Sequence, residues 1–135
     1  MKTITLYPVW AWAVVHGHKP VENRTWRTHY RGPLLIHAAA DSPVARARDK
    51  IARRMLEALG IDVPAEVPRG AIVGAVTLVD VTRQPVAHPL ATGPFCWLFA
   101  RPRCFAVPVQ AKGRLGLWNL TGEVATVVSR CYNHE

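Results

Sequence analysis

Hydrophobic and polar positions alternate near the start of the chain, which predicts a short strand over ITLYP, residues 4–8. Proline is favoured at the first position of a helix and glycine just after the last. Pro8 and Gly17 are therefore expected to bracket a short helix. The run GPLLIHAAA, residues 32–40, is almost continuously apolar, and this pattern predicts a strand that is buried on both faces.

The clearest helical pattern covers SPVARARDKIARRMLEALG, residues 42–60. Ser42 is suited to cap this helix, Pro43 to occupy its first position, and Gly60 to end it. Apolar side chains recur at spacings of seven, four and four, which predicts that one face packs on the core; they are Val44, Ile51, Met55 and Leu59. The opposite face is expected to be solvated rather than to bind a ligand; it carries Arg46, Arg53, Arg54 and Glu57.

The second half of the chain reads mainly as strands. A long strand is expected over residues 70–83, with Gly74 at a bulge or a bend of the kind that a closing barrel needs. A loop rich in proline and glycine follows from His88 to Pro94. Further runs predict strands over residues 95–100, 104–113, 115–120 and 123–132.

These elements predict an α+β fold, built round a mixed or antiparallel β-barrel with helices inserted early. A chain of 135 residues, half of them hydrophobic, has the length of one ordinary domain and can bury a substantial core. No internal repeat or composition break divides it. We therefore expect a single domain over residues 1–135.

The net charge of the chain indicates which class of molecule it is suited to bind. Seventeen lysines and arginines stand against nine aspartates and glutamates, which gives a net charge of +8, and thirteen of the seventeen are arginine. Arginine pairs with phosphates and stacks on flat rings, so the balance favours nucleic acid or another polyanion. The alternative is that the composition reflects an arginine-rich proteome, and the count alone does not separate the two.

Cysteines and histidines argue against a disulfide scaffold and a metal centre. The three cysteines are an odd number without a Cys-x-x-Cys pair, which fits a reducing cytoplasm. None of the six histidines has the helical spacing of a zinc protease motif. No apolar run approaches the roughly 20 residues of a membrane span. We expect a cytoplasmic protein without metal, cofactor or membrane contact.

Polar chemistry is concentrated between residues 17 and 39. A strand with a period of two from residue 19 to 26 would place Glu22, Arg24 and Trp26 on one face. An ion pair between Glu22 and Arg24 serves either as scaffold or as a ligand contact. Lys19 stands near arginines in the sequence, and neighbouring cations lower the pKa of a lysine and make it a better base or nucleophile. A simple phosphate contact is the alternative role for Lys19.

Five tryptophans are many for a chain of this length. Most are expected to pack in the core, as large aromatic side chains usually do. Trp26, which precedes Arg27, and Trp118 are candidates to present a flat face on which a base stacks.

These residues resemble a known family. The pattern Gly-x-Lys-x-x-Glu-x-Arg, met by Gly17, Lys19, Glu22 and Arg24, and the following YRGPLLIHAA are similar to the ASCH domain of the PUA-like superfamily. The later segments GAIVGAVTLVDV and CWLFARPRCFAVPVQAKGRLGLW agree, so the resemblance covers nearly the whole chain. It implies a PUA-like β-barrel of about five or six strands with flanking α-helices.

The resemblance also implies a cleft that holds RNA or a modified nucleobase. By position, Lys19, Glu22 and Arg24 should line this cleft. Its aromatic or polar walls would come from a set of large side chains: Trp10, Trp26, Tyr30, Trp97 or Trp118.

Some members of the family are enzymes. A bacterial N4-acetylcytidine amidohydrolase carries Lys-x-x-Thr-x-Arg, and Lys19 and Arg24 match it, but Glu22 stands in place of the threonine. Thr25 is the nearest hydroxyl in the sequence, and Asp80 is the nearest acidic residue for a later catalytic glutamate. Other ASCH proteins cut RNA, where a lysine could deprotonate a 2′-hydroxyl.

Two main hypotheses remain open. In the first, a basic cleft binds RNA or a modified nucleoside, with Arg24, Arg27 and Arg31 at phosphates and an aromatic side chain against the base. In the second, the protein hydrolyses an N4-acylated cytidine or RNA with Lys19 as the base, assisted by Glu22 and Thr25. A protein-interaction or structural role is a third alternative, and the sequence does not identify a protein partner.

Overall fold

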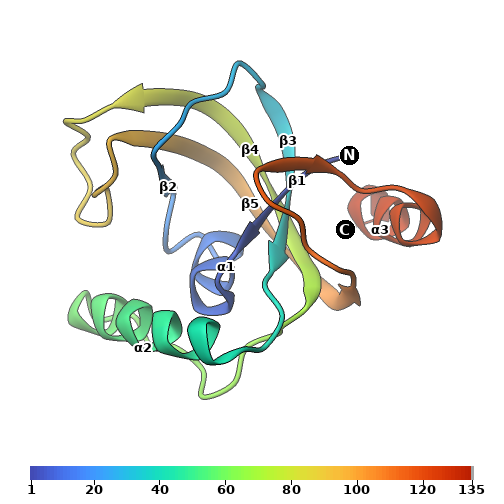
Figure 1. The fold of residues 1–135 in the computed structure, drawn as a ribbon, viewed down its shortest axis with the longest axis horizontal. Coiled ribbons are helices and arrows are strands. Elements are labelled where there is room, and N and C mark those ends of the chain that lie inside the picture. The colour runs from blue at the N-terminus through green and yellow to red at the C-terminus, as the bar shows by residue number, and fades with distance from the viewer. Residues whose placement is uncertain (135) are drawn as a thin grey trace.

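The computed structural model describes residues 1–134 and contains a six-stranded mixed sheet in the order β2-β5-β4-β3-β1-β6. The sheet curls into a half-barrel (Figure 1), which confirms the expected PUA-like α+β class. Its strands are β1 (Lys2–Leu6), β2 (Val21–Arg24), β3 (Gly32–Ala38), β4 (Ala71–Arg83), β5 (Phe95–Gln110) and β6 (Leu117–Asn119). The helices are α1 (Pro8–Val15), α2 (Pro43–Ala58) and α3 (Gly122–His134).

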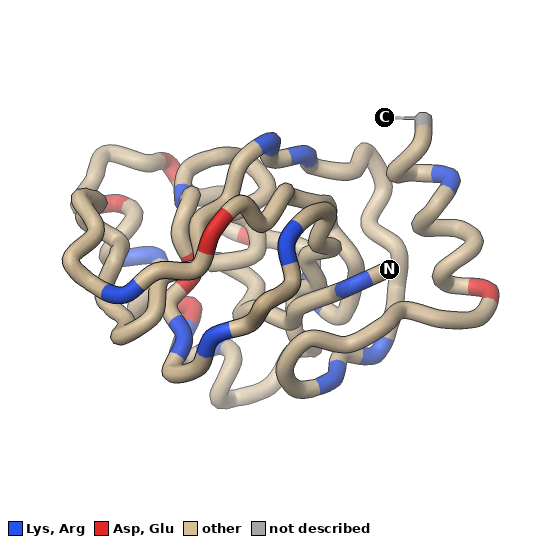
Figure 2. The backbone as a smooth tube through the Cα atoms, turned by 90° about the horizontal axis from the view of Figure 1, so that it is seen from above, with Lys and Arg blue, Asp and Glu red and all other residues tan. Residues whose placement is uncertain are grey.

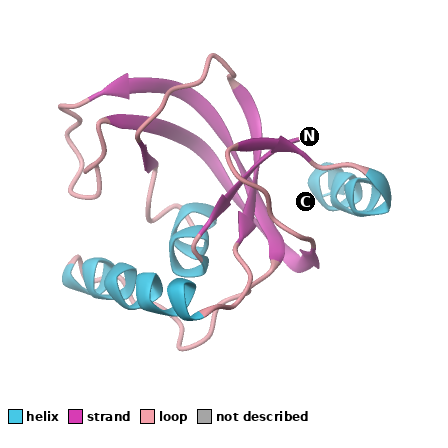
Figure 3. Ribbon diagram, in the orientation of Figure 1, coloured by secondary structure: helices cyan, strands magenta, loops and turns pink. Residues whose placement is uncertain are grey.

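Helices cover both faces of the sheet. The chain enters through β1, which runs parallel to β3, and the other strand pairs are antiparallel. Helix α1 packs inside the curl and against α2, whereas α3 lies on the far side against β5 and β4 (Figure 3). None of the helices within residues 1–134 is long and apolar enough to cross a membrane.

Strand β3 confirms the expectation that its apolar run is buried on both faces. Leu34 and Ile36 are fully buried and belong to the core inside the curl, together with Val14 of α1. Leu35, between them, is fully buried on the opposite face with Val128 of α3. Alternate side chains of a strand point to opposite faces, so a strand that is covered on both sides can carry apolar side chains at successive positions.

The expected glycine irregularity in β4 is present. The register between β4 and β5 shifts between Ile72 and Gly74. A Cβ at Gly74 would lie 2.0 Å from the carbonyl oxygen of Arg103 and 2.8 Å from Cγ1 of Val15. Only glycine lets β5 and α1 both approach β4 this closely, so this residue contributes directly to the curl of the sheet.

The ends of α2 agree with the sequence, but its buried face does not. Ser42 Oγ accepts a hydrogen bond of 3.0 Å from the backbone N–H of Ala45, and Pro43 is the first helical residue. The predicted core face is wrong, because Val44, Ile51 and Leu59 are exposed and Met55 is half-buried. The side that packs inward instead carries Ala45, Asp49, Ala52 and Leu56. Alanine permits close helix packing and Asp49 finds partners there, neither of which a hydrophobicity pattern records.

Two predictions in the second half of the chain are also wrong. The strands expected over 95–100 and 104–113 form one strand, β5, which continues through Arg101 at a φ of 50°. The strand expected over 123–132 is helix α3. Its apolar side chains recur with a helical period and pack on the sheet; they are Val124, Ala125, Val128, Cys131 and Tyr132. The burial of this face outweighs the preference of valine and threonine for strands.

Candidate ligand-binding pocket

A cavity of about 750 Å³ opens on the inner side of the half-barrel. It is lined by the end of β1, the first turns of α1, β2 and the turn before it, one face of α2, and the loops that precede β5 and β6. Segments far apart in the sequence therefore meet around one space. Its size falls within the range of pockets that hold small organic ligands.

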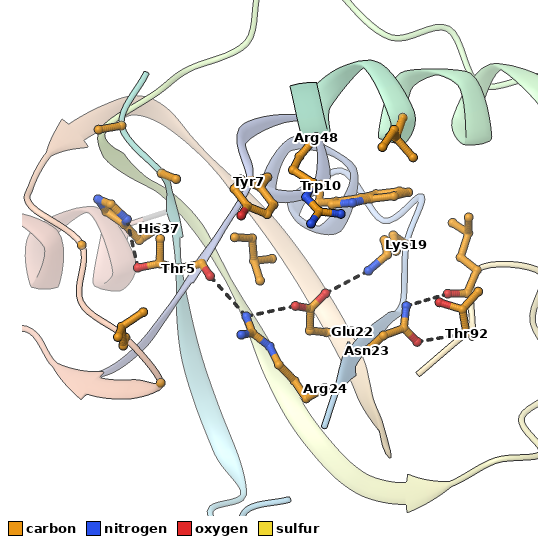
Figure 4. A pocket seen from close by; sticks show the side chains of 18 of the residues that line it. Thr5, Tyr7, Trp10, Lys19, Glu22, Asn23, Arg24, His37, Arg48 and Thr92 are labelled. Carbon is orange, nitrogen blue, oxygen red and sulfur yellow. Dashed lines mark hydrogen bonds and ion pairs between the residues drawn. The ribbon is translucent and has the colours of Figure 1, made fainter. Parts of the chain in front are cut away.

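Three charged side chains form a continuous chain along one side of this pocket. Lys19 Nζ lies 3.0 Å from Glu22 Oε1, and Arg24 Nη2 lies 3.0 Å from Glu22 Oε2. Arg24 Nη2 also donates to the backbone carbonyl of Thr5 at 3.2 Å. Figure 4 shows these groups in line, with the Glu22 carboxylate between the two cations. The period of two in β2 places Glu22 and Arg24 on the same side, as the sequence indicates.

Lys19 is deeply buried, although it belongs to the turn after α1. The residue is 2% exposed, and its ammonium lies 4.8 Å from the centre of the Trp10 ring. The Glu22 carboxylate and the ring face together offset part of the cost of removing this charge from water. The closest charged group to the lysine is thus an anion. The sequence suggested that unpaired cations surround Lys19, whereas its nearest neighbours in the structure are Glu22 and Trp10.

Asn23, between the two charged residues of β2, holds the loop before β5 in place. Its side-chain amide donates to the carbonyl of Leu90 at 2.9 Å, and its oxygen accepts from the backbone N–H groups of Thr92 and Gly93, each at 2.9 Å. Leu90 and Thr92 are thereby fixed at the edge of the pocket.

A chain of uncharged hydrogen bonds supports the opposite end of the pocket. The Trp118 indole N–H donates to Thr5 Oγ1 at 3.2 Å, and Thr5 Oγ1 lies 3.2 Å from Nδ1 of His37. His37 Nε2 lies 2.6 Å from the carbonyl oxygen of Ala111. A carbonyl only accepts, so Nε2 carries the proton and Nδ1 accepts from the threonine hydroxyl. Burial holds the pKa of His37 below its usual value, against the opposing effect of the Ala111 hydrogen bond.

The loop before β6 passes close over this end. A Cβ at Gly113 would lie 2.8 Å from His37 Cε1 and 2.9 Å from Thr5 Oγ1. Glycine at this position lets the backbone of residues 113–116 line the pocket directly above the buried histidine. Within residues 1–134, no group of three or more His, Cys, Asp or Glu side chains is placed to hold a metal ion.

The part of the lining that comes from α1 and α2 is largely apolar. Trp10 contributes an aromatic ring, and Ile51 and Met55 contribute aliphatic side chains from the face of α2 that the sequence pattern assigns to the core. Arg48 of α2 also lines the pocket and is labelled in Figure 4. Arg114 lines the pocket from the loop before β6. Neither arginine forms an ion pair with any side chain described in the structure.

Of the sequence-predicted site residues, the structure brings four together around this pocket. They are Trp10, Lys19, Glu22 and Arg24. Thr25 follows β2, is exposed, and is not part of the pocket lining, so the lysine and this hydroxyl do not share the cavity. Asp80, considered as an acidic partner, is also outside it and pairs with Arg31 at 3.4 Å.

The remaining candidates contact other parts of the molecule. Trp26 packs edge-on against Trp97, with ring centres 4.8 Å apart, and Trp97 is fully buried. Trp118 is buried behind the pocket wall, where its N–H reaches Thr5. The other three candidates, Arg27, Tyr30 and Arg31, lie outside the pocket lining. Arg27 lies near the ring of Phe95, and the Tyr30 hydroxyl donates to the Pro33 carbonyl. Arg31 donates to the backbone carbonyls of Thr28 and Tyr30.

Sequence reasoning missed much of the pocket. Thr5 lies on a segment read only as an alternating strand and His37 on one read as buried, and their hydrogen-bonded pairing depends on the neighbouring positions of β1 and β3. Arg48, Ile51 and Met55 recur at spacings of three and four on one helix face. An arginine within an otherwise apolar stripe was the available signal that this face meets solvent or a ligand rather than the core.

The half-barrel with its inward pocket defines a PUA-like α+β fold. A family model, the ASCH domain, matches residues 4–93, and the chain belongs to this family, which is linked to RNA binding. Crystal structures of ASCH from Zymomonas mobilis and of a single-residue variant superpose with TM-scores of 0.55 and 0.58 at 15% and 14% identity. These alignments cover 95% and 96% of this chain and 93% and 96% of the respective Zymomonas chains.

Curated relatives extend the comparison. Activating signal cointegrator 1 of Homo sapiens is 28% identical over 130 residues, which is 90% of this chain and 22% of the human protein. The Mus musculus protein of the same name is 26% identical over the same shares. The chain thus spans about a fifth of the length of these relatives, so their similarity concerns one part of a much longer protein.

Proposed function

We propose that the pocket binds single-stranded RNA or a modified nucleoside by taking one base into the cavity. The observation that carries the proposal is the buried chain of Lys19, Glu22 and Arg24 along one wall of a 750 Å³ pocket. Buried charges are costly unless they are paired, and these are paired while still bordering an open space. Such a wall offers fixed hydrogen-bonding groups to a ligand.

The contrast between the charged chain and the apolar lining from α1 and α2 supports a flat heterocyclic ligand. A nucleobase has apolar faces and a polar edge, so it can contact Trp10 and Ile51 with its ring and the charged chain with its edge. Arg48 and Arg114, which have no carboxylate partner among the described side chains, are available to phosphates at the entrance. Lysines and arginines are spread along the chain trace in Figure 2, and the net charge of +8 favours such a partner.

The test uses two arginines of the same helix. Binding of a fluorescently labelled eight-nucleotide RNA would be measured by anisotropy between about 50 and 200 mM salt for wild type, Arg48→Ala and Arg54→Ala. Arg54 is exposed and lies outside the pocket lining, so it controls for the loss of one charge. We expect Arg48→Ala to weaken binding and to reduce the salt slope by about 0.7, as for one lost phosphate contact on a single strand.

Arg54→Ala should leave both the affinity and the salt slope close to those of wild type. Equal losses in the two variants would place the RNA elsewhere on the basic surface and contradict the proposal. An affinity that does not change with salt would do the same, because phosphate contacts release counterions.

A hydrolase is the second candidate, favoured by the hydrogen bond of 3.0 Å between Lys19 and Glu22 at the pocket wall. This pair could exchange a proton with a bound amide or with a 2′-hydroxyl. Wild type and Lys19→Met would be incubated with N4-acetylcytidine and with a short RNA, and the products examined by mass spectrometry. Product formed by wild type alone would support hydrolysis, whereas intact substrates with both proteins would leave binding as the function.

A further inference from the structure

The three charged groups in the pocket present donors and acceptors in a defined order. The Lys19 ammonium donates, the Glu22 carboxylate accepts, and the Arg24 guanidinium donates, and the three lie in line along the wall (Figure 4). Resting on the proposed function, we propose that the pocket selects a base whose edge has an N–H flanked by two carbonyl groups. This imide edge belongs to uracil and other pyrimidine-2,4-diones.

Each member of the chain retains bonding capacity for such a ligand. Glu22 accepts one contact at each carboxylate oxygen, and a carboxylate has about four lone-pair sites. Lys19 uses one of its three N–H donors on Glu22. The Arg24 Nε–H is buried and has no hydrogen-bond partner among the described residues, while Nη2 serves Glu22 and the Thr5 carbonyl.

The positions of these groups are fixed before a ligand arrives. The side chains of Lys19 and Glu22 are 3% and 11% exposed, and that of Arg24 is 23% exposed. The carboxylate is held from both sides, so it cannot turn away from a mismatched edge without breaking an ion pair. A site whose polar groups are pre-positioned and shielded from water discriminates strongly, because a mismatch leaves buried groups unpaired.

An imide edge matches this order at each of its three positions. Its N–H donates to Glu22, and its two carbonyl oxygens accept from Lys19 and Arg24. Cytosine instead turns the lone pair of N3 toward the Glu22 carboxylate, which places two acceptors face to face. Guanine can donate to Glu22 through N1–H and its amino group, but it then offers no acceptor to one of the flanking cations.

The test compares ligands that differ only at this edge. Affinities would be measured by fluorescence anisotropy for labelled octamers of uridine, cytidine and 3-methyluridine, with uridine and guanosine monophosphates as unlabelled competitors. The methyl group replaces the imide hydrogen and leaves the ring and the phosphates unchanged. We expect the uridine octamer to bind roughly tenfold or more tightly than the other two, and the uridine nucleotide to compete better than the guanosine nucleotide.

A matched variant examines the central group. Glu22→Gln has nearly the same shape but offers an amide N–H to the base, so the preference should move from uridine toward cytidine. The chain of contacts loses its charge in this variant, so circular dichroism and urea unfolding would first establish that it is folded. Should it fail to fold, the 3-methyluridine comparison in the wild-type protein decides alone.

Each outcome separates this inference from the proposed function. Equal binding of the three octamers, or stronger binding of cytidine or guanosine ligands, overturns the imide preference and leaves RNA binding in place. Absence of binding to every octamer overturns both. A uridine preference that Glu22→Gln leaves unchanged would show that another part of the pocket reads the base, and would equally overturn the inference.

Discussion

Two buried ion-pair clusters of this protein have similar contacts but different roles: one borders the pocket and the other joins α2 to α1. In the pocket, Glu22 is held between Lys19 and Arg24 at 3.0 Å on either side. On α2, Asp49 Oδ2 lies 2.8 Å from Nη1 of Arg69 in the segment before β4, although the two are not aligned for a hydrogen bond. Taken as whole residues, Glu22 is 8% and Asp49 is 4% exposed, so burial does not distinguish them.

The difference lies in what else the carboxylates meet. Asp49 Oδ1 accepts a hydrogen bond of 3.0 Å from the backbone N–H of Val9, one of the groups that the first turn of α1 leaves without a helical partner. Asp49 is therefore a cap that α2 supplies to α1, and it does not line the large cavity. Glu22 keeps its remaining lone pairs beside that cavity. A buried ion pair indicates a candidate site only when unused hydrogen-bonding capacity faces accessible space.

The largest expected effect comes from breaking the structural cluster. Asp49→Ala leaves Arg69 buried without its main partner and Val9 without its acceptor, so the free energy of unfolding should fall by about 3–5 kcal/mol. Urea unfolding monitored by tryptophan fluorescence would measure it. Asp49→Asn can still accept from Val9 and should lose less. RNA affinity of the folded fraction should remain within about twofold of wild type for Asp49→Asn, because Asp49 does not line the pocket.

Breaking the ion pairs of the pocket should cost less stability than breaking the Asp49 cluster, but more RNA affinity. Glu22→Ala leaves Lys19 and Arg24 without the anion between them, but Arg24 keeps the Thr5 carbonyl and Lys19 keeps the Trp10 ring, so we expect a smaller loss of about 1–3 kcal/mol. RNA affinity should fall about tenfold or more, as for a residue that pairs with a base. A stability loss accompanied by unchanged RNA affinity would mean that this cluster, like the other, is only scaffold.

His37, at the uncharged end of the pocket, should make the free energy of unfolding depend on pH. Burial lowers the pKa of His37 below 6.5, so the unfolded chain takes up a proton at a higher pH than the folded protein does. The free energy of unfolding should therefore fall as the pH is lowered through and below about 6.5. His16, whose pKa is lowered by burial and by nearby His18, acts in the same direction.

Urea unfolding at about pH 7.5 and pH 5.5 would separate the two histidines when wild type is compared with His37→Gln. The variant should retain only the dependence that His16 contributes. An unchanged pH dependence in His37→Gln would show that His37 does not carry this effect.

The smallest effect is expected at the surface, where Asp41 links the Asp49–Arg69 pair to Arg46. Arg46 lies 3.8 Å from Glu66, and both side chains are largely exposed to solvent. Exposed pairs at this distance contribute little, so Glu66→Ala should leave the urea midpoint unchanged within error. A clear shift would indicate that the surface contacts of Arg46 support the Asp49 cluster beneath them.

The sequence was sufficient where neighbouring residues decide the outcome. Ser42 and Pro43 begin α2 as expected, and the alternation in β2 puts Glu22 and Arg24 on one side because the period of a strand is fixed by its backbone. The Gly-x-Lys-x-x-Glu-x-Arg pattern led to the correct family and, with it, to three residues of the pocket.

Only the tertiary structure decided which surfaces meet. The buried side of α2 depends on α1 supplying Val9 to Asp49, and α3 is a helix because its apolar face finds the outer side of the sheet. The pocket wall of Arg48, Ile51 and Met55 follows from that same packing of α2. Local patterns specify the period and ends of an element, whereas the partner of each face is selected by the free energy of burial over the whole chain.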